Sequence, residues 1–238
     1  MADWTAIGPE TGPEGDIVRL VRMAGREMGK TGAYPTQDAA EAQARGAVLR
    51  IGEGAQEVPA PVLPEQGRAL PDLVQSSPPD RLDGWARVAV AGFLADKGDW
   101  DGVLCIAGAD VSHWAHVSAG EVVSFQGFLT PRLVTALGGA GAADAQAVAD
   151  SLSRPERLAT HLRSAAIAGR PEATTGHLVG AELAAARPYW LGQQVAVIGQ
   201  DAPQAAALMA QGVPVQEVSP QAMRAAGLAA LADRLGLA

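Results

Sequence analysis

The apolar and polar positions in the middle of the chain predict three strands followed by a helix. Val103–Ala107 is a short apolar run that ends at Gly108, which is typical of a buried strand. Two further segments place β-branched and aromatic residues between small or polar ones, with a Ser-Ala-Gly turn signal between them. Thr130 and Pro131 form a helix-start signal, with threonine as the cap and proline at the first helical position. The second and third predicted strands are Ser112–Val117 and Glu121–Leu129, so the hairpin region covers residues 103–129.

The residues before this region predict shorter elements. The first 15 residues are rich in Gly, Pro and Glu and are expected to be irregular. Residues 25–35 are rich in glycine and end in a proline, which predicts a loop. Residues 59–79 carry six of the 16 prolines, which argues against long regular elements and favours a linker or wrapping loop. The expected elements are strands at Asp16–Met23 and Ala47–Ile51 and helices at Thr36–Arg45 and Asp83–Ala95.

After the central region the pattern alternates between helix and strand. Three helical segments come first, then two short apolar strands separated by a helix, and then a final helix that Ser219 caps and that runs to about Leu235. This alternation is typical of parallel βαβ units with helices packed on a sheet. The expected helices are Asp144–Ser151, Pro155–Ala168, Thr174–Leu191 and Pro203–Gln211, and the expected strands are Val195–Ile198 and Val213–Val218.

Composition and charge exclude several classes of protein. A hydrophobic content of 48% is enough for a packed core, and the formal net charge of −8 argues against a nucleic-acid or anionic-membrane surface. The single cysteine, Cys105, falls inside a predicted buried strand, which excludes a disulfide framework and a thiolate metal cluster. The sequence shows no apolar run that could span a bilayer and no signal-peptide pattern at its start. We therefore expect a cytoplasmic protein, and the sequence leaves its oligomeric state open, a homodimer included.

One segment fits a loose phosphate-binding pattern. Ala24–Thr31 follows a predicted strand and matches a Walker A motif with alanine in the first place. A true phosphate loop opens a helix at its Lys-Thr pair, whereas Gly32 and Pro35 would end such a helix within one turn. The alternative is that the segment is a plain glycine-rich loop. If it is a phosphate loop, the protein would be a P-loop nucleotidase, which is one of three functional hypotheses.

Polar side chains gather at the predicted turn after Gly108. We expect Asp110, Ser112 and His113 to lie at the tip of the hairpin, where His113 could act as a partial cation or a general base; the alternative is an exposed turn histidine beside an exposed aspartate. Arg132 could bind an anion or be a solvated first-turn arginine.

Three other polar residues are expected to be structural. Glu182 lies among small residues, so close helix packing explains its neighbours without chemistry. His161 and His177 lack metal-ligand spacing, and no metal site is expected.

Several segments, in their order and spacing, resemble the 2-dehydro-3-deoxygalactonokinase family of sugar kinases. The clearest is Leu-Val-Gly-Ala-Glu-Leu at 178–183, which is similar to the family's Leu-Ile-Gly-Ala-Glu-(Val/Ile) helix. The strand and turn Val-Ile-Gly-Gln-Asp at 197–201 look like the family's adenosine-side strand, where backbone amides approach the nucleotide. The other matching segments are Gly108–Trp114, Phe125–Leu133, Gln211–Val215 and Ala226–Leu228.

The resemblance implies an α/β fold of the actin-like ATPase and sugar-kinase class, with ribonuclease-H-like lobes. It implies a shortened N-terminal lobe with a Pro-rich connection at residues 1–80 and a kinase-like lobe at residues 81–238. ATP and Mg²⁺ are the implied cofactors, and 2-dehydro-3-deoxygalactonate or a similar keto-deoxy sugar acid is the implied substrate. The implied roles are catalysis for Asp110 and His113, substrate binding for Ser112, Thr130 and Arg132, and nucleotide binding for Gly108, Gly199, Gln200 and Asp201.

The chain also departs from the family pattern. The opening Asp-Trp-Gly-Ser-Thr-Asn of the kinases is matched only by Asp3 and Trp4, and the family's Arg-Gly-Glu-Glu appears as Asp-Gly-Trp-Ala at 83–86, without either glutamate. Val111 and His113 stand where the family has histidine and lysine, and Thr-Gly-Glu has become Thr-Pro-Arg at 130–132. Because phosphoryl transfer depends on positioning and charge neutralisation, the alternative function is a non-catalytic sugar-acid or nucleotide-binding regulator or subunit.

Overall fold

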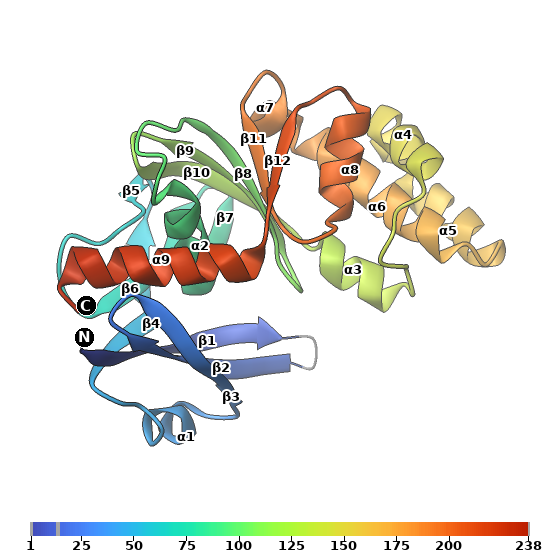
Figure 1. The fold of residues 1–238 in the computed structure, drawn as a ribbon. Helices are drawn as coiled ribbons and strands as arrows, with labels where there is room; N and C mark the ends of the chain where they lie inside the picture. The colour runs from blue at the N-terminus through green and yellow to red at the C-terminus, as the bar shows by residue number, and fades with distance from the viewer. Residues whose placement is uncertain (1, 13–14, 238) are drawn as a thin grey trace. The chain divides into compact units, whose positions relative to one another are not determined.

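The computed structural model describes residues 2–12 and 15–237, which form two compact units (Figure 1). The first unit holds the chain up to Asp101, together with His116–Phe125 and the chain from Ser219 on. The second unit holds Gly102–Ala115 and Gln126–Val218. Each unit is therefore discontinuous in sequence, unlike the predicted division between residues 80 and 81.

A mixed six-stranded sheet forms the centre of the first unit. Its strand order is β3-β2-β1-β4-β6-β7, with β1, β4 and β6 parallel and the other neighbours antiparallel. The expectation that residues 1–15 are irregular is wrong for residues 3–12, because pairing with β2 and β4 buries Trp4, Ala6 and Ile7 in β1; residues 1, 13 and 14 lie outside the described residues. The strands are β1 (Asp3–Gly12), β2 (Gly15–Ala24), β3 (Glu27–Tyr34), β4 (Ala47–Glu57), β6 (Ala69–Ser76) and β7 (Pro79–Leu82).

The segment that fits the Walker A pattern is the turn between β2 and β3 and the first part of β3. Lys30 and Thr31 lie within β3, and Thr31 pairs with Val21 of β2. A strand does not present the free amides of a helix N-terminus to a phosphate. The predicted loop at 25–35 and the P-loop hypothesis are therefore both wrong.

The proline-rich segment also contains regular structure. β6 has eight residues, although few long elements were expected there. Pro71 is tolerated because it lies opposite the irregularity in the β4–β6 pairing, between the partners Ile51 and Ala55, where a missing donor costs little. The expectation of a linker or wrapping loop is therefore wrong for residues 69–76.

Two helices of the first unit cross at glycines. α2 (Gly84–Leu94) is capped by Asp83, and α9 (Pro220–Leu235) is capped by Ser219, as predicted. A side chain added at Gly92 would overlap the carbonyl oxygen of Met223, and one added at Gly227 would overlap that of Val88. The two backbones are therefore in direct contact where α2 passes behind α9 in Figure 1.

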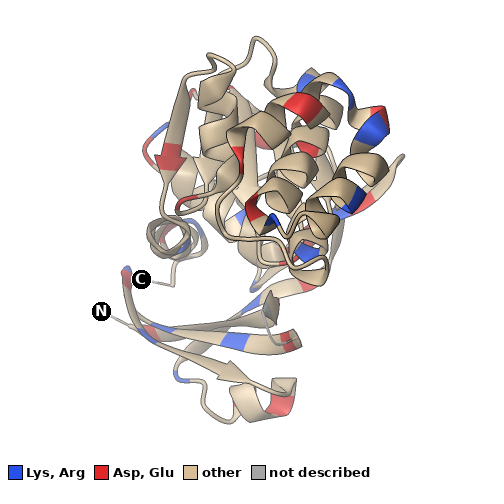
Figure 2. Cartoon of the chain, turned by 90° about the vertical axis from the view of Figure 1, so that its right-hand side faces the viewer, with Lys and Arg blue, Asp and Glu red and all other residues tan. Residues whose placement is uncertain are grey.

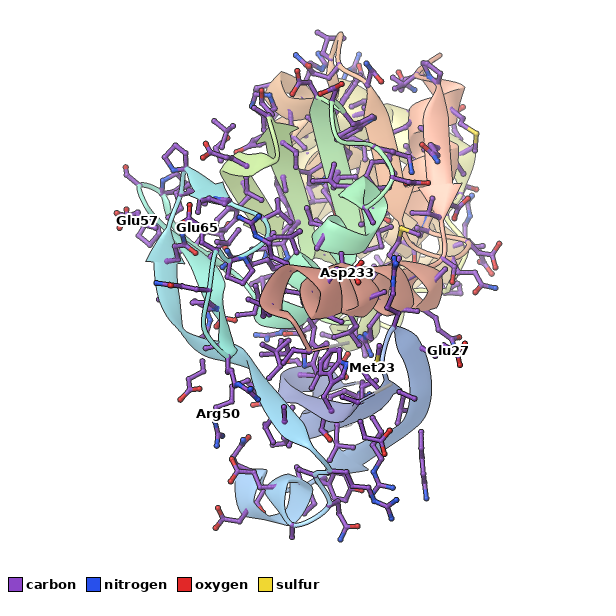
Figure 3. All side chains as sticks on the ribbon, turned by 60° about the vertical axis from the view of Figure 1, so that its left-hand side comes forward. Met23, Glu27, Arg50, Glu57, Glu65 and Asp233 are labelled. Carbon is purple, nitrogen blue, oxygen red and sulfur yellow. The ribbon has the colours of Figure 1, made fainter. Side chains whose placement is uncertain are left out.

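The core of the first unit lies between the sheet and these helices. Trp4, Met23, Trp85, Leu228 and Leu231 belong to one cluster of buried side chains. Figure 3 shows Met23 on the side of α9 that faces the sheet, with Asp233 on the helix itself. The short helix α1 (Gln37–Glu41) begins at the predicted cap, Thr36, which accepts a hydrogen bond from the amide of Ala39.

Parallel strands form the centre of the second unit, as the apolar runs predicted. β8 (Gly102–Ala107) pairs with β11 (Val195–Ile198), which pairs with β12 (Val215–Val218). The second sheet has the order β12-β11-β8-β9-β10-β5, and the chain passes from one unit to the other within β9 and β10. The three strands predicted in the middle of the chain are thus confirmed. The remaining strands are β9 (Ser112–Ser118), β10 (Glu121–Phe128) and β5 (Ala60–Pro61).

Helices cover the parallel strands of the second unit. α6 crosses α4 closely, because side chains added at Gly176 or Gly180 would overlap the carbonyl oxygens of Asp144 or Val148. The predicted helices are confirmed with two differences: the segment predicted as one helix at 174–191 is divided into α6 and α7, and residues 155–157 form a 3₁₀ turn before α5. They are α3 (Thr130–Ala136), α4 (Ala145–Ser153), the 3₁₀ turn Pro155–Arg157, α5 (Leu158–Ile167), α6 (Pro171–Ala185), α7 (Arg187–Trp190) and α8 (Pro203–Ala210).

A serine connects two histidines within this group of helices. The Ser151 Oγ of α4 lies 3.0 Å from Nδ1 of His161 and 3.0 Å from Nδ1 of His177, and the two rings are 4.6 Å apart. A hydroxyl has one proton, so one imidazole accepts from Ser151 and the other donates to it. The arrangement therefore holds α4, α5 and α6 together while at least one ring is neutral.

We expect this cluster to make the protein less stable at acidic pH. Burial, followed by the nearby His161, lowers the pKa of His177, although Asp150 and Asp144 oppose the shift. The unfolded chain then binds a proton more readily than the folded chain, so stability falls as the pH drops below about 6.5, by at most about 1.4 kcal/mol per pH unit. Urea unfolding at pH 8 and pH 5.5 should show a smaller difference for His177→Gln than for the wild type. Equal differences would contradict the prediction.

Candidate functional site

The predicted site residues of the second unit meet at one edge of its parallel strands. Ile106 of β8 pairs with Ile198 of β11, and both strands end immediately afterwards. The turns that follow carry Gly108 and Asp110 on one side and Gly199–Asp201 on the other. Ligands of open α/β sheets bind beyond the carboxyl ends of parallel strands. This edge is therefore the candidate site.

An ion pair closes the first of these turns. Asp110 accepts hydrogen bonds from Nε of Arg132, at 2.6 Å, and from its terminal nitrogen, while the amide of Arg132 donates to the carbonyl of Asp110 at 3.3 Å. The hydrogen bonds from Arg132 lower the pKa of Asp110, so this carboxylate is ionised at neutral pH. A side chain at Gly108 would overlap the carbonyl oxygen of Val111, which explains the glycine. The pair joins the turn to the start of α3.

The second turn uses two of its amides for internal hydrogen bonds. The amide of Gly199 donates to the carbonyl of Val218 at 3.1 Å, and that of Ala202 donates to the Glu217 carboxylate at 3.2 Å. The expectation that the Gly199 amide contacts a nucleotide is therefore not supported by this geometry. Gln200 and Asp201 are exposed, and Asp201 has a left-handed backbone with φ 54°.

Ser112 and His113 do not lie at the tip of the turn. Of the three predicted residues, only Asp110 lies in the turn. β9 begins at Ser112, and the side chains of Ser112 and His113 are both buried. Side chains alternate along a strand, so Ser112 and Trp114 share one face of β9 and His113 lies on the other. The predicted tip cluster of three residues is therefore wrong, and the alternative of an exposed turn histidine is wrong as well.

A buried carboxylate lies beneath the face of β9 that carries Ser112. Glu182 of α6 is only 2% exposed, and its Oε1 accepts hydrogen bonds from Ser112 Oγ and Trp114 Nε1, both at 2.9 Å. The Gln204 amide of α8 lies 3.4 Å from both carboxylate oxygens, and the Thr130 side chain hydrogen-bonds the same carboxylate. Four uncharged side chains from β9, α3 and α8 thus converge on Glu182.

The environment of Glu182 affects its titration and that of its neighbour. Burial raises the pKa of Glu182, and the hydrogen bonds from Thr130, Trp114, Ser112 and Gln204 oppose that shift. Burial also raises the pKa of Cys105 well above its usual range, with Glu182 as a second cause. Cys105 is therefore an unreactive core thiol, as predicted.

The same network explains why Thr130 is not the predicted helix cap. α3 begins at Thr130 itself, Leu129 takes the cap position, and no side chain caps the helix. The Thr130 side chain is buried and hydrogen-bonds Glu182 instead. To cap the helix, the Thr130 hydroxyl would have to face the amides of α3. It faces Glu182 instead, so the hydrogen bond to Glu182 replaces the cap.

Glu182 is the residue that sequence reasoning missed. Its close packing was expected, and Gly180 does pack against α4, but residues two positions apart lie on nearly opposite faces of a helix. Glu182 therefore faces β9. The available signal was an acidic residue inside the run of small and apolar residues at 178–186.

The edge offers oxygen ligands to a cofactor of the implied kind. Mg²⁺ is bound through carboxylate oxygens and phosphates, and Asp110 and Asp201 supply carboxylates in the two turns. Among the described residues, no group of three or more His, Cys, Asp and Glu side chains is arranged to hold a metal ion. The Mg²⁺ site therefore stays a prediction, in which a bound nucleotide would supply most of the ligands and the carboxylates of the two turns the rest.

The face drawn in Figure 2 is not basic, and no described helix spans a membrane. Figure 2 shows Lys and Arg dispersed among Asp and Glu on the helices that face the viewer. None of the described helices has the length and apolar character needed to cross a membrane. The charge pattern therefore gives no support to a nucleic-acid surface on this face.

Comparison with solved structures identifies the fold. A candidate 2-dehydro-3-deoxygalactonokinase protein from Sinorhizobium meliloti matches with a TM-score of 0.76 and 20% identity, over 96% of this chain and 98% of that one. An Acidaminococcus fermentans (R)-2-hydroxyglutaryl-CoA dehydratase component (12% identity, 97% and 96% covered) and a Clostridium difficile 2-hydroxyisocaproyl-CoA dehydratase activator with bound ADPNP (9%, 98% and 95%) reach TM-scores of only 0.47 and 0.48, too low to support an inference. The chain thus has an α/β fold of the actin-like ATPase class with two mixed sheets, as the resemblance implied.

Comparison at the level of sequence identifies the family. No curated protein matches the chain. The model of the 2-keto-3-deoxy-galactonokinase family matches residues 69–231, which is more than half of the 238 residues and includes both turns of the candidate site. The chain therefore belongs to the 2-keto-3-deoxy-galactonokinase family.

Proposed function

We propose that the protein transfers a phosphoryl group from ATP to 2-keto-3-deoxygalactonate or a similar keto-deoxy sugar acid. The observation that carries this proposal is the family match, which spans the strands and turns of the candidate site. An ionised Asp110 and an adjacent arginine at the carboxyl ends of parallel strands support it, since an anionic substrate and phosphates need fixed charges there.

The proposed roles follow the chemistry of the side chains. Arg132, which Asp110 fixes in one orientation, binds the carboxylate of the sugar acid, because a guanidinium pairs with a carboxylate through parallel hydrogen bonds. Asp110 holds the metal side and orients the substrate hydroxyl, while Gln200 and Asp201 lie on the nucleotide side. When bound, ATP supplies the phosphoryl group and Mg²⁺ neutralises its charge. The catalytic role of His113 stays a prediction. Its side chain is buried on the face of β9 opposite Ser112, which does not favour that role.

Slow turnover is part of the proposal. Trp85 and Ala86 stand where the family has glutamates, and single oriented groups are commonly worth about 10²–10⁴-fold in rate. The shortened N-terminal lobe also stays a prediction. The closed Asp110–Arg132 pair favours a second candidate function, a non-catalytic relative that binds the sugar acid.

An assay of ADP formation tests the proposal. The protein is incubated with ATP, Mg²⁺ and 2-keto-3-deoxygalactonate, and we expect ADP above the level seen without the sugar acid. Asp110→Asn should lower the rate by about 100-fold, because the hydroxyl and Arg132 lose their orienting charge. Arg163→Gln, an exposed arginine on α5, is the matched control and should leave the rate unchanged.

Binding separates the two candidate functions. A ligand that binds only the folded state raises the melting temperature. A rise with the sugar acid alone, without ADP formation, would replace the kinase by the non-catalytic binder. Neither a rise nor ADP would overturn both.

A further inference from the structure

Glu182 lies where it can control the geometry of the candidate site without touching a ligand. It is buried, and the side chains around it come from three elements that border the edge. Two of them, Ser112 and Thr130, lie two residues from Asp110 and Arg132. The hydroxyls of Ser112 and Thr130 therefore link the buried carboxylate to the charged pair at the surface.

The pair joins a tight turn to a helix start that has no side-chain cap. Gly108 allows the tight turn, and the helix start is that of α3. The amide of Arg132 donates to the carbonyl of Asp110, so the turn and the start of α3 move together. Glu182 accepts hydrogen bonds from Ser112 and Thr130, and so it joins the turn and the start of α3 to α6.

We infer that Glu182 is a positioning residue, which holds Ser112 and Thr130 and thereby orients Asp110 and Arg132 for the sugar acid. This inference rests on the proposed function. Glutamine at 182 keeps the shape but replaces an acceptor oxygen by an NH₂ group. In one orientation that group would face the indole N–H of Trp114, which has no acceptor capacity. In the other it would take the place of Oε2, opposite the amide nitrogen of Gln204.

The first test is kinetic. Glu182→Gln should lower kcat by about 10–100-fold per folded molecule and change KM for ATP by less than about threefold, since misplacement by about 1 Å costs about that much in rate. Thr130→Val removes one hydroxyl and should give part of this loss, whereas Thr130→Ser keeps the hydroxyl and should restore the rate. Ser151→Ala, which removes another buried hydroxyl of the same unit, is the matched control.

The second test does not need turnover. Hydrogen exchange of backbone amides should rise at residues 109–113 and 130–133 in Glu182→Gln and Thr130→Val, and stay unchanged there in Ser151→Ala and Thr130→Ser. If the wild type forms no ADP, the proposed function fails while the exchange pattern still decides the inference. A uniform rise along the chain, no rise in these two segments, or an unchanged kcat would overturn it.

Discussion

Replacement of Arg87 by methionine is expected to lower the free energy of unfolding by about 3–5 kcal/mol. Arg87 is fully buried in α2 and donates to the carbonyls of Val62 (3.0 Å), Pro71 (2.8 Å) and Pro61 (2.6 Å) and to the Gln56 side chain (3.0 Å). Burial lowers its pKa to about 10, so the side chain stays charged at neutral pH. Methionine fills the space but leaves the buried carbonyl of Val62 and three partly buried acceptors without donors, and a buried acceptor left unpaired costs about 1–3 kcal/mol.

The measurement is urea unfolding of the variant beside two controls. Arg163→Met changes an exposed arginine and should alter stability by less than about 0.5 kcal/mol. Arg87→Lys keeps the charge but not the planar fork, so it should fall between the wild type and Arg87→Met. A loss below about 1 kcal/mol for Arg87→Met would show that the carbonyls find other donors.

Gly92→Ala should also destabilise the protein, by about 1–2 kcal/mol. The added methyl group would overlap the carbonyl oxygen of Met223 and lie 2.7 Å from the amide nitrogen of Gly227, so α2 and α9 must separate. Overpacking costs about 1–3 kcal/mol or more, which exceeds the gain of about 1 kcal/mol from the better helix former. Thermal or urea unfolding measures the loss.

Two further variants define the cause of that loss. Gly98→Ala places a methyl group in open space and should be close to neutral. The double variant Gly92→Ala with Gly227→Ala should lose less than the sum of the single variants, because the first substitution already separates the helices. Additive losses would contradict direct contact of the two backbones.

The elements that could be predicted from sequence are those in which consecutive residues are apolar because both faces of the element are buried. β8 and β11 are buried parallel strands, and such strands appear as continuous apolar runs. β3 was missed because its two glycines and its Glu and Lys residues have little strand preference of their own, and pairing with β2 holds it. β6 was missed because proline is tolerated only where the pairing is irregular, and a single sequence does not reveal that register.

The positions of several site residues could be predicted from sequence, but the contacts between them could not. Sequence reasoning located Asp110, Arg132 and the turn after β11, because glycines and polar residues after apolar runs mark turns at a sheet edge. It did not predict that Asp110 pairs with Arg132, or that Ser112 hydrogen-bonds Glu182, which is 70 residues away. Such contacts depend on the packing of α6 against β9, and residue spacing does not encode them.

A ligand footprint on the wild-type protein tests most directly whether the edge formed by β8 and β11 is the ligand site. Hydrogen exchange is measured at each backbone amide with and without Mg²⁺, a non-hydrolysable ATP analogue and 2-keto-3-deoxygalactonate. We predict slower exchange at residues 108–112 and 199–202 when all three are present. Protection confined to residues 24–31, or to any region without these two turns, would contradict that placement.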